Sequence, residues 1–333
     1  MNCFDFEEER IKQEIQDLGA KRVLLQLPQG LKPEATRLAK VVEEMGVFTL
    51  ISADSCYGAC DVAIDEAVSL GVDLIIHFGH SRFVRHEAVS TIYVEARALV
   101  NINESLEKAL QLLSGYSKIG LATSVQHLHT LNETREFLVR SGKTVVIGDA
   151  GSVEHAGQVI GCDYSNVKSI VDAVEAYLFI GGGLFHALGI ALSTYRPTIV
   201  VDPYDNRVFS LSETVQKLLK QHWVCIEQTR NAKNIGIIIG LKPGQKRVEA
   251  AIKVKELIEK HGKNAYLLAI REVTPEALLD FPTIDAYVNT SCPRISLDAP
   301  EKFAKPLLTV NEFMVASGEA SWESMLKEGL FEK

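Results

Sequence analysis

Apolar and polar positions along the chain follow two alternating patterns. Short apolar runs are separated by longer stretches in which apolar residues recur every three to four positions. The first pattern is typical of buried strands and the second of amphipathic helices, and their alternation predicts β-α-β units that form parallel sheet. The predicted strands are residues 23–28, 48–53, 74–79, 92–96, 118–123, 144–147, 177–181, 198–202, 234–239, 264–270, 286–290 and 307–311. The sequence therefore predicts an α/β fold.

The predicted strands fall into three sets of four that resemble one another. In each set the first strand precedes a helix-compatible stretch that ends at a glycine, the residue that most often terminates a helix. These glycines are Gly46, Gly142 and Gly262. Each set closes with a strand that ends at an acidic residue, which we expect to cap a helix or loop rather than to act as a base. These acids are Glu95, Asp202 and Glu312.

We therefore predict three homologous domains, each a four-stranded, mainly parallel sheet flanked by helices. The repeat is as long as an ordinary domain and too long for a solenoid unit. The expected domains are residues 1–110, 111–230 and 231–333. Three similar units with short links suggest a pseudo-threefold arrangement around a common centre, although a linear arrangement would satisfy the sequence equally well.

The composition is that of a globular protein with more than one domain. Its 333 residues exceed the length at which a single hydrophobic core stops growing. The net charge of −8 argues against nucleic-acid binding, which needs a basic surface. Residues 176–195 carry no charged side chain, but a triple glycine interrupts them, so we expect a buried strand, a turn and a helix rather than a membrane span. Because the start of the chain lacks the pattern of a secretory signal, we predict a cytoplasmic protein that does not bind membranes.

One cysteine in each predicted domain lies on a loop that follows a strand. These are Cys60, Cys162 and Cys292. In parallel sheets ligands bind beyond the carboxyl ends of the strands. Three thiolates on a [4Fe–4S] cluster would leave one iron open to a substrate. Small neighbours such as Gly161 would let backbone amides approach the sulfur atoms of the cluster. The sequence therefore favours an open iron–sulfur site at the centre.

Other ligand sets remain open. Cys56 could donate its thiolate instead of Cys60 or beside it. Three cysteines together with His80 or His186 could hold zinc, although structural zinc sites usually draw paired ligands from one local loop. We expect Cys3 and Cys225 to take no part in metal binding, because a lone cysteine is most often a small apolar residue.

Five motifs carry a resemblance to a known family. They are CYGACD (56–61), GQVIGCDYS (157–165), NTSCPRI (289–295), LQLPQGLK (25–32) and GGGLFHALG (181–189). In this order, and over essentially the whole chain, they resemble the archaeal diphthamide synthases, the 2-(3-amino-3-carboxypropyl)histidine synthase family. The resemblance implies a homodimer of three-domain α/β subunits, each with a [4Fe–4S] cluster held by Cys60, Cys162 and Cys292.

The resemblance also implies a reaction. S-adenosylmethionine (SAM) would bind at the open iron, and an electron from the cluster, which an external electron donor reduces, would break the bond between the sulfur and the methionine γ-carbon. The resulting 3-amino-3-carboxypropyl radical would add to a histidine of elongation factor 2, the first step of diphthamide biosynthesis. This chemistry resembles that of radical-SAM enzymes, but the chain lacks their C-x₃-C-x₂-C motif, since Ala63 stands where the third cysteine would be.

Several residues near strand ends are candidates for SAM contacts. A helix N-terminus after the triple glycine could receive the methionine carboxylate, and an arginine beside Cys292 could pair with a carboxylate. The candidates are Gln29, Gly30, His80, Gly181, Gly182, Gly183 and Arg294. Because a radical must be guarded from stray donors, we expect an apolar centre that stays closed until the histidine of the partner protein enters.

Two other functions compete with this one. Quinolinate synthase is also a three-domain enzyme with three cysteines on a [4Fe–4S] cluster, but it is a dehydratase that needs no SAM. Alternatively, the chain could be a non-catalytic subunit that holds a cluster for electron transfer or as a scaffold. The sequence contexts of Cys60 and Cys292 favour the diphthamide family over quinolinate synthase. The presence of all three cysteines in one chain favours a self-sufficient enzyme over a non-catalytic subunit.

Overall fold

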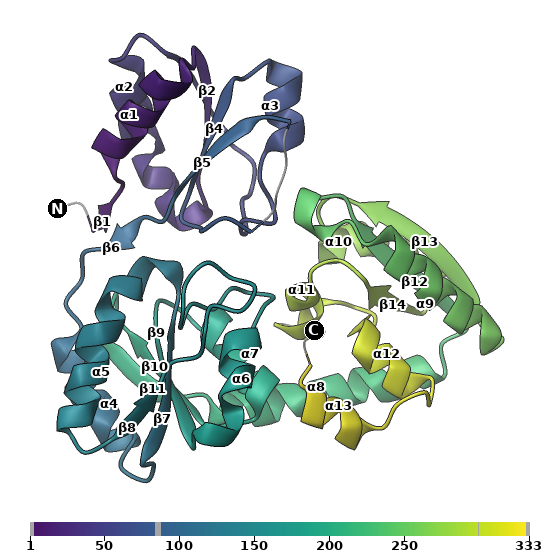
Figure 1. The fold of residues 1–333 in the computed structure, drawn as a ribbon. Helices are drawn as coiled ribbons and strands as arrows, with labels where there is room; N and C mark the ends of the chain where they lie inside the picture. Colours follow the sequence, from purple (N-terminus) through teal and green to yellow (C-terminus); the bar gives the residue numbers. More distant parts are fainter. Residues whose placement is uncertain (1–2, 84–87, 299, 331–333) are drawn as a thin grey trace.

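Three sheets, each flanked by helices, surround a common centre in the computed structural model, which describes residues 3–83, 88–298 and 300–330 (Figure 1). In Figure 1 the first domain lies at the top, the second at the lower left and the third at the right. The α/β fold and the arrangement around a centre are therefore confirmed, and the linear alternative is excluded.

The three sheets repeat one strand order. They run β3-β2-β4-β5, β11-β10-β9-β7-β8 and β13-β12-β14-β15. In each sheet, the four strands that the sequence predicts are parallel. The first of them along the chain lies between the second and the third. The strands are β2 (Arg22–Gln26), β3 (Phe48–Ile51), β4 (Leu74–Phe78), β5 (Ser90–Val94), β7 (Lys118–Thr123), β8 (Thr144–Val146), β9 (Ala176–Ile180), β10 (Thr198–Asp202), β11 (Arg207–Ser210), β12 (Asn234–Gly240), β13 (Asn264–Ile270), β14 (Ala286–Asn289) and β15 (Leu307–Thr309). The shared order supports three homologous units.

The helices cover both faces of these sheets. They are α1 (Glu8–Leu18), α2 (Ala35–Glu43), α3 (Ile64–Leu70), α4 (Asn103–Leu112), α5 (Leu131–Arg140), α6 (Ser165–Ser169), α7 (Phe185–Thr194), α8 (Ser212–Arg230), α9 (Val248–Lys260), α10 (Pro275–Leu279), α11 (Pro293–Leu297), α12 (Val310–Ala316) and α13 (Trp322–Glu328). Short 3₁₀ turns lie at Gln29–Glu34, Val125–Thr130, Val171–Ala173, Pro243–Gln245 and Pro300–Lys302. The glycines predicted to end α2, α5 and α9 have φ angles of 79°, 83° and 71°, so that prediction is confirmed.

All twelve predicted strands are present, and the described residues contain three further short strands that were not predicted. β11 adds an antiparallel fifth strand to the second sheet. Its sequence has only two apolar residues, Val208 and Phe209, which is too weak a pattern to predict a strand. β1 (Phe4–Asp5) and β6 (Arg97–Ala98) form a separate two-residue pair.

The helices at the predicted boundaries of 110 and 230 pack on the sheets that follow them in the chain. α4 crosses the first boundary and packs on β10 and β11, with Ile102 and Leu106 in the core of the second domain. α8 packs on α12 and β15 of the third domain. Each domain therefore begins with the helix that precedes its first strand, namely α1, α4 or α8. The prediction assigned these helices to the preceding domain because nothing in a helix's own sequence says which sheet its apolar face covers.

The acids that close each set have structural roles, as expected. Asp202 accepts hydrogen bonds from the amides of Gly183 and Tyr204, and Glu95 pairs with His155. Glu312 does not lie at the end of a strand, because β15 ends at Thr309. The Thr309 hydroxyl accepts from the Glu312 amide, and the Glu312 carboxylate accepts from the Thr309 amide. This capping box starts α12 two residues earlier than the strand prediction allowed.

The uncharged stretch 176–195 forms β9, the glycine turn and α7, as predicted. Among the described residues, the helices all fall short of the length and apolar character that crossing a membrane requires.

A buried ion pair fastens α8 to the third domain. His222 Nδ1 lies 2.7 Å from Glu312 Oε1, and His222 Nε2 lies 3.2 Å from the Leu297 carbonyl oxygen. A carboxylate beside Nδ1 and a carbonyl oxygen beside Nε2 both favour the charged imidazolium over the neutral ring. Burial by itself lowers the pKa of His222, but the attraction of Glu312 outweighs it and raises the pKa above the ordinary value.

Replacing His222 with Gln is expected to lower the free energy of unfolding by about 3 kcal/mol or more, because it leaves Glu312 buried without its counter-charge. Because the pKa is raised on folding, this contribution is complete below about pH 6.5 and is lost as the pH rises through the folded-state value. Denaturant titrations at pH 6 and pH 9 should therefore show a larger deficit at pH 6. His261→Gln, which removes a partly exposed pair with Glu319, should cost at most about 1 kcal/mol; equal deficits for His222→Gln at both pH values would contradict the charged pair.

Candidate functional site

A cavity of about 970 Å³ lies where the three domains meet. Its wall is built from loops that follow strands of all three sheets: residues 28–31 after β2, 56–60 after β3, 79–81 after β4, 124–126 after β7, Gly182 after β9 and Lys242 after β12. This is the place that the strand-end rule assigns to ligands in parallel sheets. The volume is at the upper end of the range for small-molecule sites.

The three predicted cysteines border this one cavity. Cys60, Cys162 and Cys292 come from the first, second and third domains, and none is in a disulfide. Burial raises the pKa of Cys162 to about 12, and the charges of Cys60 and Cys292 add to the effect. Burial likewise raises the pKa of Cys292 to about 11, with a contribution from Cys60. The thiolates of Cys162 and Cys292 are therefore each disfavoured by other cysteines of the set, and a cation bound between them would offset that repulsion.

Contacts from the third domain position Cys60. Its carbonyl oxygen accepts from the Gly244 amide at 2.8 Å, and its Sγ lies 3.5 Å from the side-chain nitrogen of Gln245. Gln245 in turn accepts a hydrogen bond from Ser291, the residue before Cys292. One glutamine thus links the cysteine of the first domain to that of the third.

A buried lysine reinforces the same contact. Lys242 Nζ lies 2.9 Å from Asp61 and 2.8 Å from Glu272, and 4.2 Å from the centre of the Tyr57 ring. Burial opposes its charge, but Glu272 and Asp61 together raise the pKa of Lys242 above the ordinary value. The ammonium group therefore stays charged and ties the loop that carries Cys60 to the third domain.

Arg294 is buried beside Cys292 and also borders the cavity. Its Nη1 donates to the Tyr164 hydroxyl at 2.7 Å and its Nε to Asp298 at 2.7 Å, while its guanidinium lies 3.7 Å from the centre of the Phe185 ring. Two of these contacts reach residues of the second domain. The charge is therefore fixed at the wall of the cavity, as recognition of a carboxylate requires.

Two glycines near the cavity leave room for aromatic rings. A Cβ on Gly161 would lie 2.4 Å from the Phe185 ring, and one on Gly189 would lie 1.8 Å from the Tyr164 hydroxyl. Both distances are far below van der Waals contact, so the rings beside Cys162 and Arg294 occupy the space that side chains would take. Gly161, beside Cys162, thus has a packing role. The sequence suggested a different role for it, in which a small residue lets backbone amides approach the sulfur atoms of a cluster.

The remaining candidates separate into two groups. Gln29, Gly30, His80 and Gly182 border the cavity. The amides of Gly181 and Gly183 already donate to the Val201 carbonyl and the Asp202 carboxylate. These two amides are therefore bonded within the chain, whereas Gly182 lies at the wall of the cavity.

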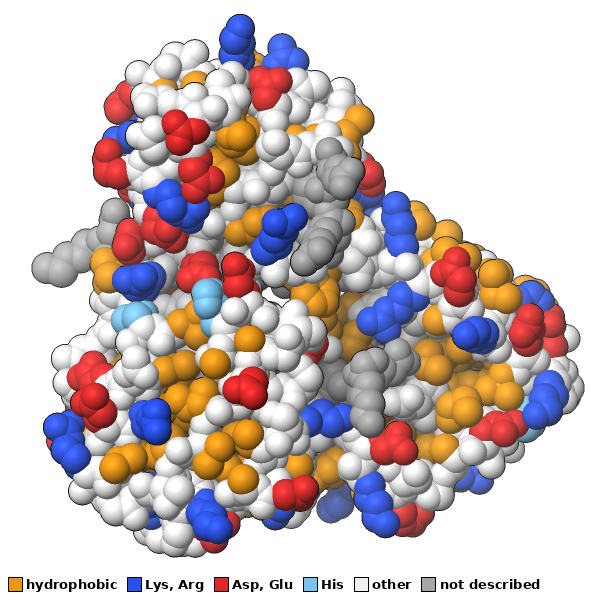
Figure 2. Space-filling model, in the orientation of Figure 1, with side chains coloured by type: hydrophobic (Ala, Val, Ile, Leu, Met, Phe, Trp, Pro, Cys, Tyr) orange, Lys and Arg blue, Asp and Glu red, His pale blue; other side chains and the backbone are white. Residues whose placement is uncertain are grey.

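The centre is apolar, as expected, but it is not closed. The expectation that it stays closed until the histidine of the partner protein enters is therefore wrong. Aromatic side chains on its border are exposed, with accessible fractions of 62% for Tyr57, 43% for Tyr204 and 39% for Phe185. Figure 2 shows apolar side chains at the hollow between the domains. The border of the cavity is therefore partly exposed to solvent.

Several residues at this site are not among the candidates predicted from the sequence. Lys242 and Gln245 follow β12 just as Gln29 and Gly30 follow β2, so the strand-end rule applied to the third domain would have found them. Tyr164 gave no signal, because its role depends on contact with a residue of another domain.

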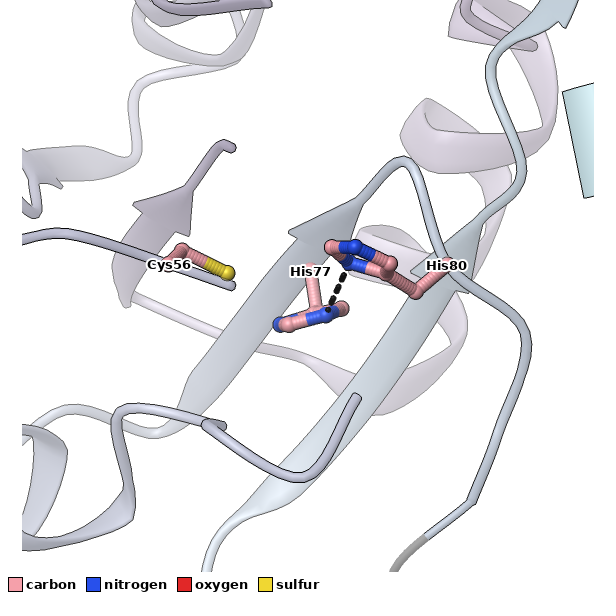
Figure 3. A group of neighbouring side chains, drawn as sticks. All are labelled: Cys56, His77 and His80. Carbon is pink, nitrogen blue, oxygen red and sulfur yellow. Dashed lines mark hydrogen bonds between the residues drawn. The ribbon is translucent and has the colours of Figure 1, made fainter. Parts of the chain in front are cut away.

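The first domain adds a second group of potential metal ligands. The ligand atoms of Cys56, His77 and His80 all lie within 4.8 Å of one another (Figure 3). Cys56 and His80 border the cavity, whereas His77 lies behind them on β4. Burial lowers the pKa of His80 to about 4, so its imidazole is neutral at physiological pH.

Comparison with known proteins identifies the family. The family model described as "Putative diphthamide synthesis protein" matches residues 27–326. The chain belongs to the diphthamide synthesis family. It is 38% identical over 310 residues to the 2-(3-amino-3-carboxypropyl)histidine synthase of Pyrococcus horikoshii. The aligned region covers 92% of this chain and 89% of that protein. Subunit 1 of the same synthase in Schizosaccharomyces pombe is 28% identical, over 92% of this chain and 72% of the relative.

A member of the diphthamide synthesis family also has the same fold. The crystal structure of Dph2 from Pyrococcus horikoshii with a 4Fe-4S cluster superimposes with a TM-score of 0.89 at 35% identity, covering 98% of this chain and 94% of that one. The resemblance drawn from the five motifs is therefore confirmed. The family match favours diphthamide synthesis over quinolinate synthase.

Proposed function

We propose that the chain is a 2-(3-amino-3-carboxypropyl)histidine synthase, which cleaves SAM and transfers its 3-amino-3-carboxypropyl group to a histidine of elongation factor 2. The observation that carries the proposal is the convergence of one cysteine from each domain on one cavity. The likeness of the whole chain to a cluster-bearing Dph2 supports it.

The proposed ligands of the cluster are Cys60, Cys162 and Cys292, and their surroundings fit such a group. The buried thiols repel one another when ionised, so a multiply charged iron centre stabilises the arrangement. Gln245 can donate to the Cys60 sulfur, a contact that tunes iron–sulfur clusters. When bound, the cluster supplies the electron that breaks the bond between the sulfonium sulfur and the methionine γ-carbon.

The chain supplies orientation for this reaction. Arg294 offers a fixed positive charge for the methionine carboxylate, beside Cys292, so that the amino acid part of SAM lies next to the metal site. Gln29, Gly30, His80 and Gly182 border the rest of the cavity and are proposed to contact SAM. The exposed aromatic border leaves room for a histidine loop of the protein substrate.

We also propose a homodimer in the cytoplasm, reduced by a separate electron donor. β13 is an edge strand, and Tyr266 and Leu267 on it are 47% and 41% exposed. An exposed apolar edge is a template for pairing with another chain, and a second copy presents the same edge. Free cysteines throughout the chain suit a reducing compartment.

Replacing any one of Cys60, Cys162 and Cys292 with Ser is expected to remove most of the iron and sulfide and to lower methylthioadenosine release by more than tenfold. The reason is that each variant leaves only two of the three proposed thiolate ligands. Iron and sulfide analysis after anaerobic reconstitution, followed by an assay with dithionite, SAM and elongation factor 2, measures both effects. Cys225→Ser is the matched control and should leave both unchanged. Modified elongation factor formed at the wild-type rate by all three variants would refute the proposal.

Arg294→Gln is expected to weaken SAM binding by about 10- to 100-fold, because a charge-assisted hydrogen bond contributes roughly 1.5–3 kcal/mol. Anaerobic calorimetry on the reconstituted enzyme measures the dissociation constant. Tyr164→Phe, which removes one partner of Arg294 but keeps the charge, should have a smaller effect. Unchanged SAM affinity in Arg294→Gln would leave this arginine with a structural role only.

Leu267→Lys is expected to convert the dimer to a monomer, since it places two like charges across a paired edge. Light scattering after size-exclusion chromatography measures the mass. The control is Leu112→Lys, an exposed leucine of the second domain, which should leave the dimer intact. A monomeric wild-type protein, or a dimeric Leu267→Lys variant, would contradict this interface.

A further inference from the structure

Three metal-binding side chains meet in the first domain outside the set of Cys60, Cys162 and Cys292. Cys56 lies on the loop after β3, His77 on β4 and His80 just beyond the end of β4. Figure 3 shows the thiol of Cys56 directed toward the two imidazole rings. His77 and His80 are joined by a hydrogen bond of 2.9 Å between Nε2 and Nδ1, and all three ligand atoms lie within 4.8 Å of one another.

A buried glutamine fixes the tautomer of His77. Gln26 donates through its side-chain nitrogen to the Asp61 carbonyl at 2.7 Å and accepts through Oε1 from the Ala63 amide at 3.0 Å. The amide orientation is therefore set by the backbone. Oε1 also lies 2.8 Å from His77 Nδ1, so Nδ1 must carry the proton. His77 Nε2 then presents its lone pair toward His80 and Cys56.

This arrangement is the one that metal-binding histidines use. In such sites the nitrogen that does not bind the metal usually donates to an oxygen that orients the ring. A tetrahedral zinc ion with bonds of about 2.0–2.3 Å holds its ligand atoms roughly 3.3–3.8 Å apart. The group in this chain needs only small side-chain shifts to reach that spacing. In the structure His80 Nδ1 donates to His77 Nε2, so metal binding through His80 Nδ1 requires its proton to move, through solvent, to Nε2 of the same ring.

We propose that Cys56, His77 and His80 form a mononuclear zinc site, separate from the iron–sulfur site. One thiolate and two imidazoles are ligands that suit zinc and not magnesium or calcium. Three protein ligands leave the fourth position of a tetrahedral ion open. Because Cys56 and His80 border the central cavity and His77 lies behind them, that position is accessible to water or to a ligand in the cavity.

The site gives Cys56 a role distinct from that of Cys60, four residues away. The Gln26 contacts reach Asp61 and Ala63 on the same loop, so one glutamine positions both the loop after Cys60 and His77. The proposal does not depend on SAM cleavage, since it concerns only which metal this group binds.

Elemental analysis of the anaerobically reconstituted enzyme tests the proposal. The expected result is about one zinc per chain beside the iron of the cluster, after incubation with zinc and removal of the excess. Cys56→Ser and His77→Gln should each lose the zinc and keep the iron, while Cys225→Ser should keep both. In the variant with Cys60, Cys162 and Cys292 all replaced by Ala, the iron should be lost and the zinc retained. That pattern separates this site from the cluster and from the proposed activity.

Cobalt substitution supplies a second measurement that does not depend on metal content alone. Tetrahedral cobalt in the triple-alanine variant should have visible d–d bands and a thiolate-to-cobalt charge-transfer band, and Cys56→Ser should abolish the charge-transfer band. Thermal melting of each variant checks that it is folded. Absence of zinc and cobalt binding in the folded triple-alanine variant would overturn the proposal. So would loss of iron rather than zinc in Cys56→Ser, which would instead make Cys56 a cluster ligand.

Discussion

The convergence of three separate domains on one set of thiols is the constraint on which this site depends. No single domain contains more than one cysteine of the set, so the position of each sulfur depends on how the domains pack. The contacts that fix this packing lie beside the cysteines themselves. Lys242 and Gln245 join the third domain to the loop of Cys60, and Arg294 joins it to Tyr164 of the second.

These interdomain contacts are polar and are buried or partly buried. Removing one member leaves a buried charge or donor unsatisfied, which costs more than the intact contact contributes. The domains are therefore held in a specific arrangement rather than by apolar burial alone. Aromatic packing also contributes to this arrangement. The rings of Phe185 and Tyr164 pack against Gly161 and Gly189, where a Cβ would occupy the space of the rings.

The wall of the cavity combines neutral and charged side chains. His80 and His186 are neutral because burial lowers the pKa of each, to about 4 and about 3. Arg294 keeps its charge against burial through Tyr164 and Asp298. A fixed cation beside neutral imidazoles and thiols suits a ligand that carries a carboxylate next to a soft metal centre. The exposed aromatic border then leaves the cavity open for a protein substrate.

The sequence by itself determined the α/β class, the three repeated units, twelve strands and the three cysteines on strand-end loops, because these follow from local periodicity, terminating glycines and the direction of parallel strands. It could not assign α4 and α8 to their domains, since an amphipathic helix does not specify which sheet covers its apolar face. Nor could it predict that the Gly183 amide is taken by Asp202, that the centre is open, or that Cys56 lies beside His77 and His80. Those features are contacts between residues far apart in the chain, and only the packing of the domains and their loops decides them.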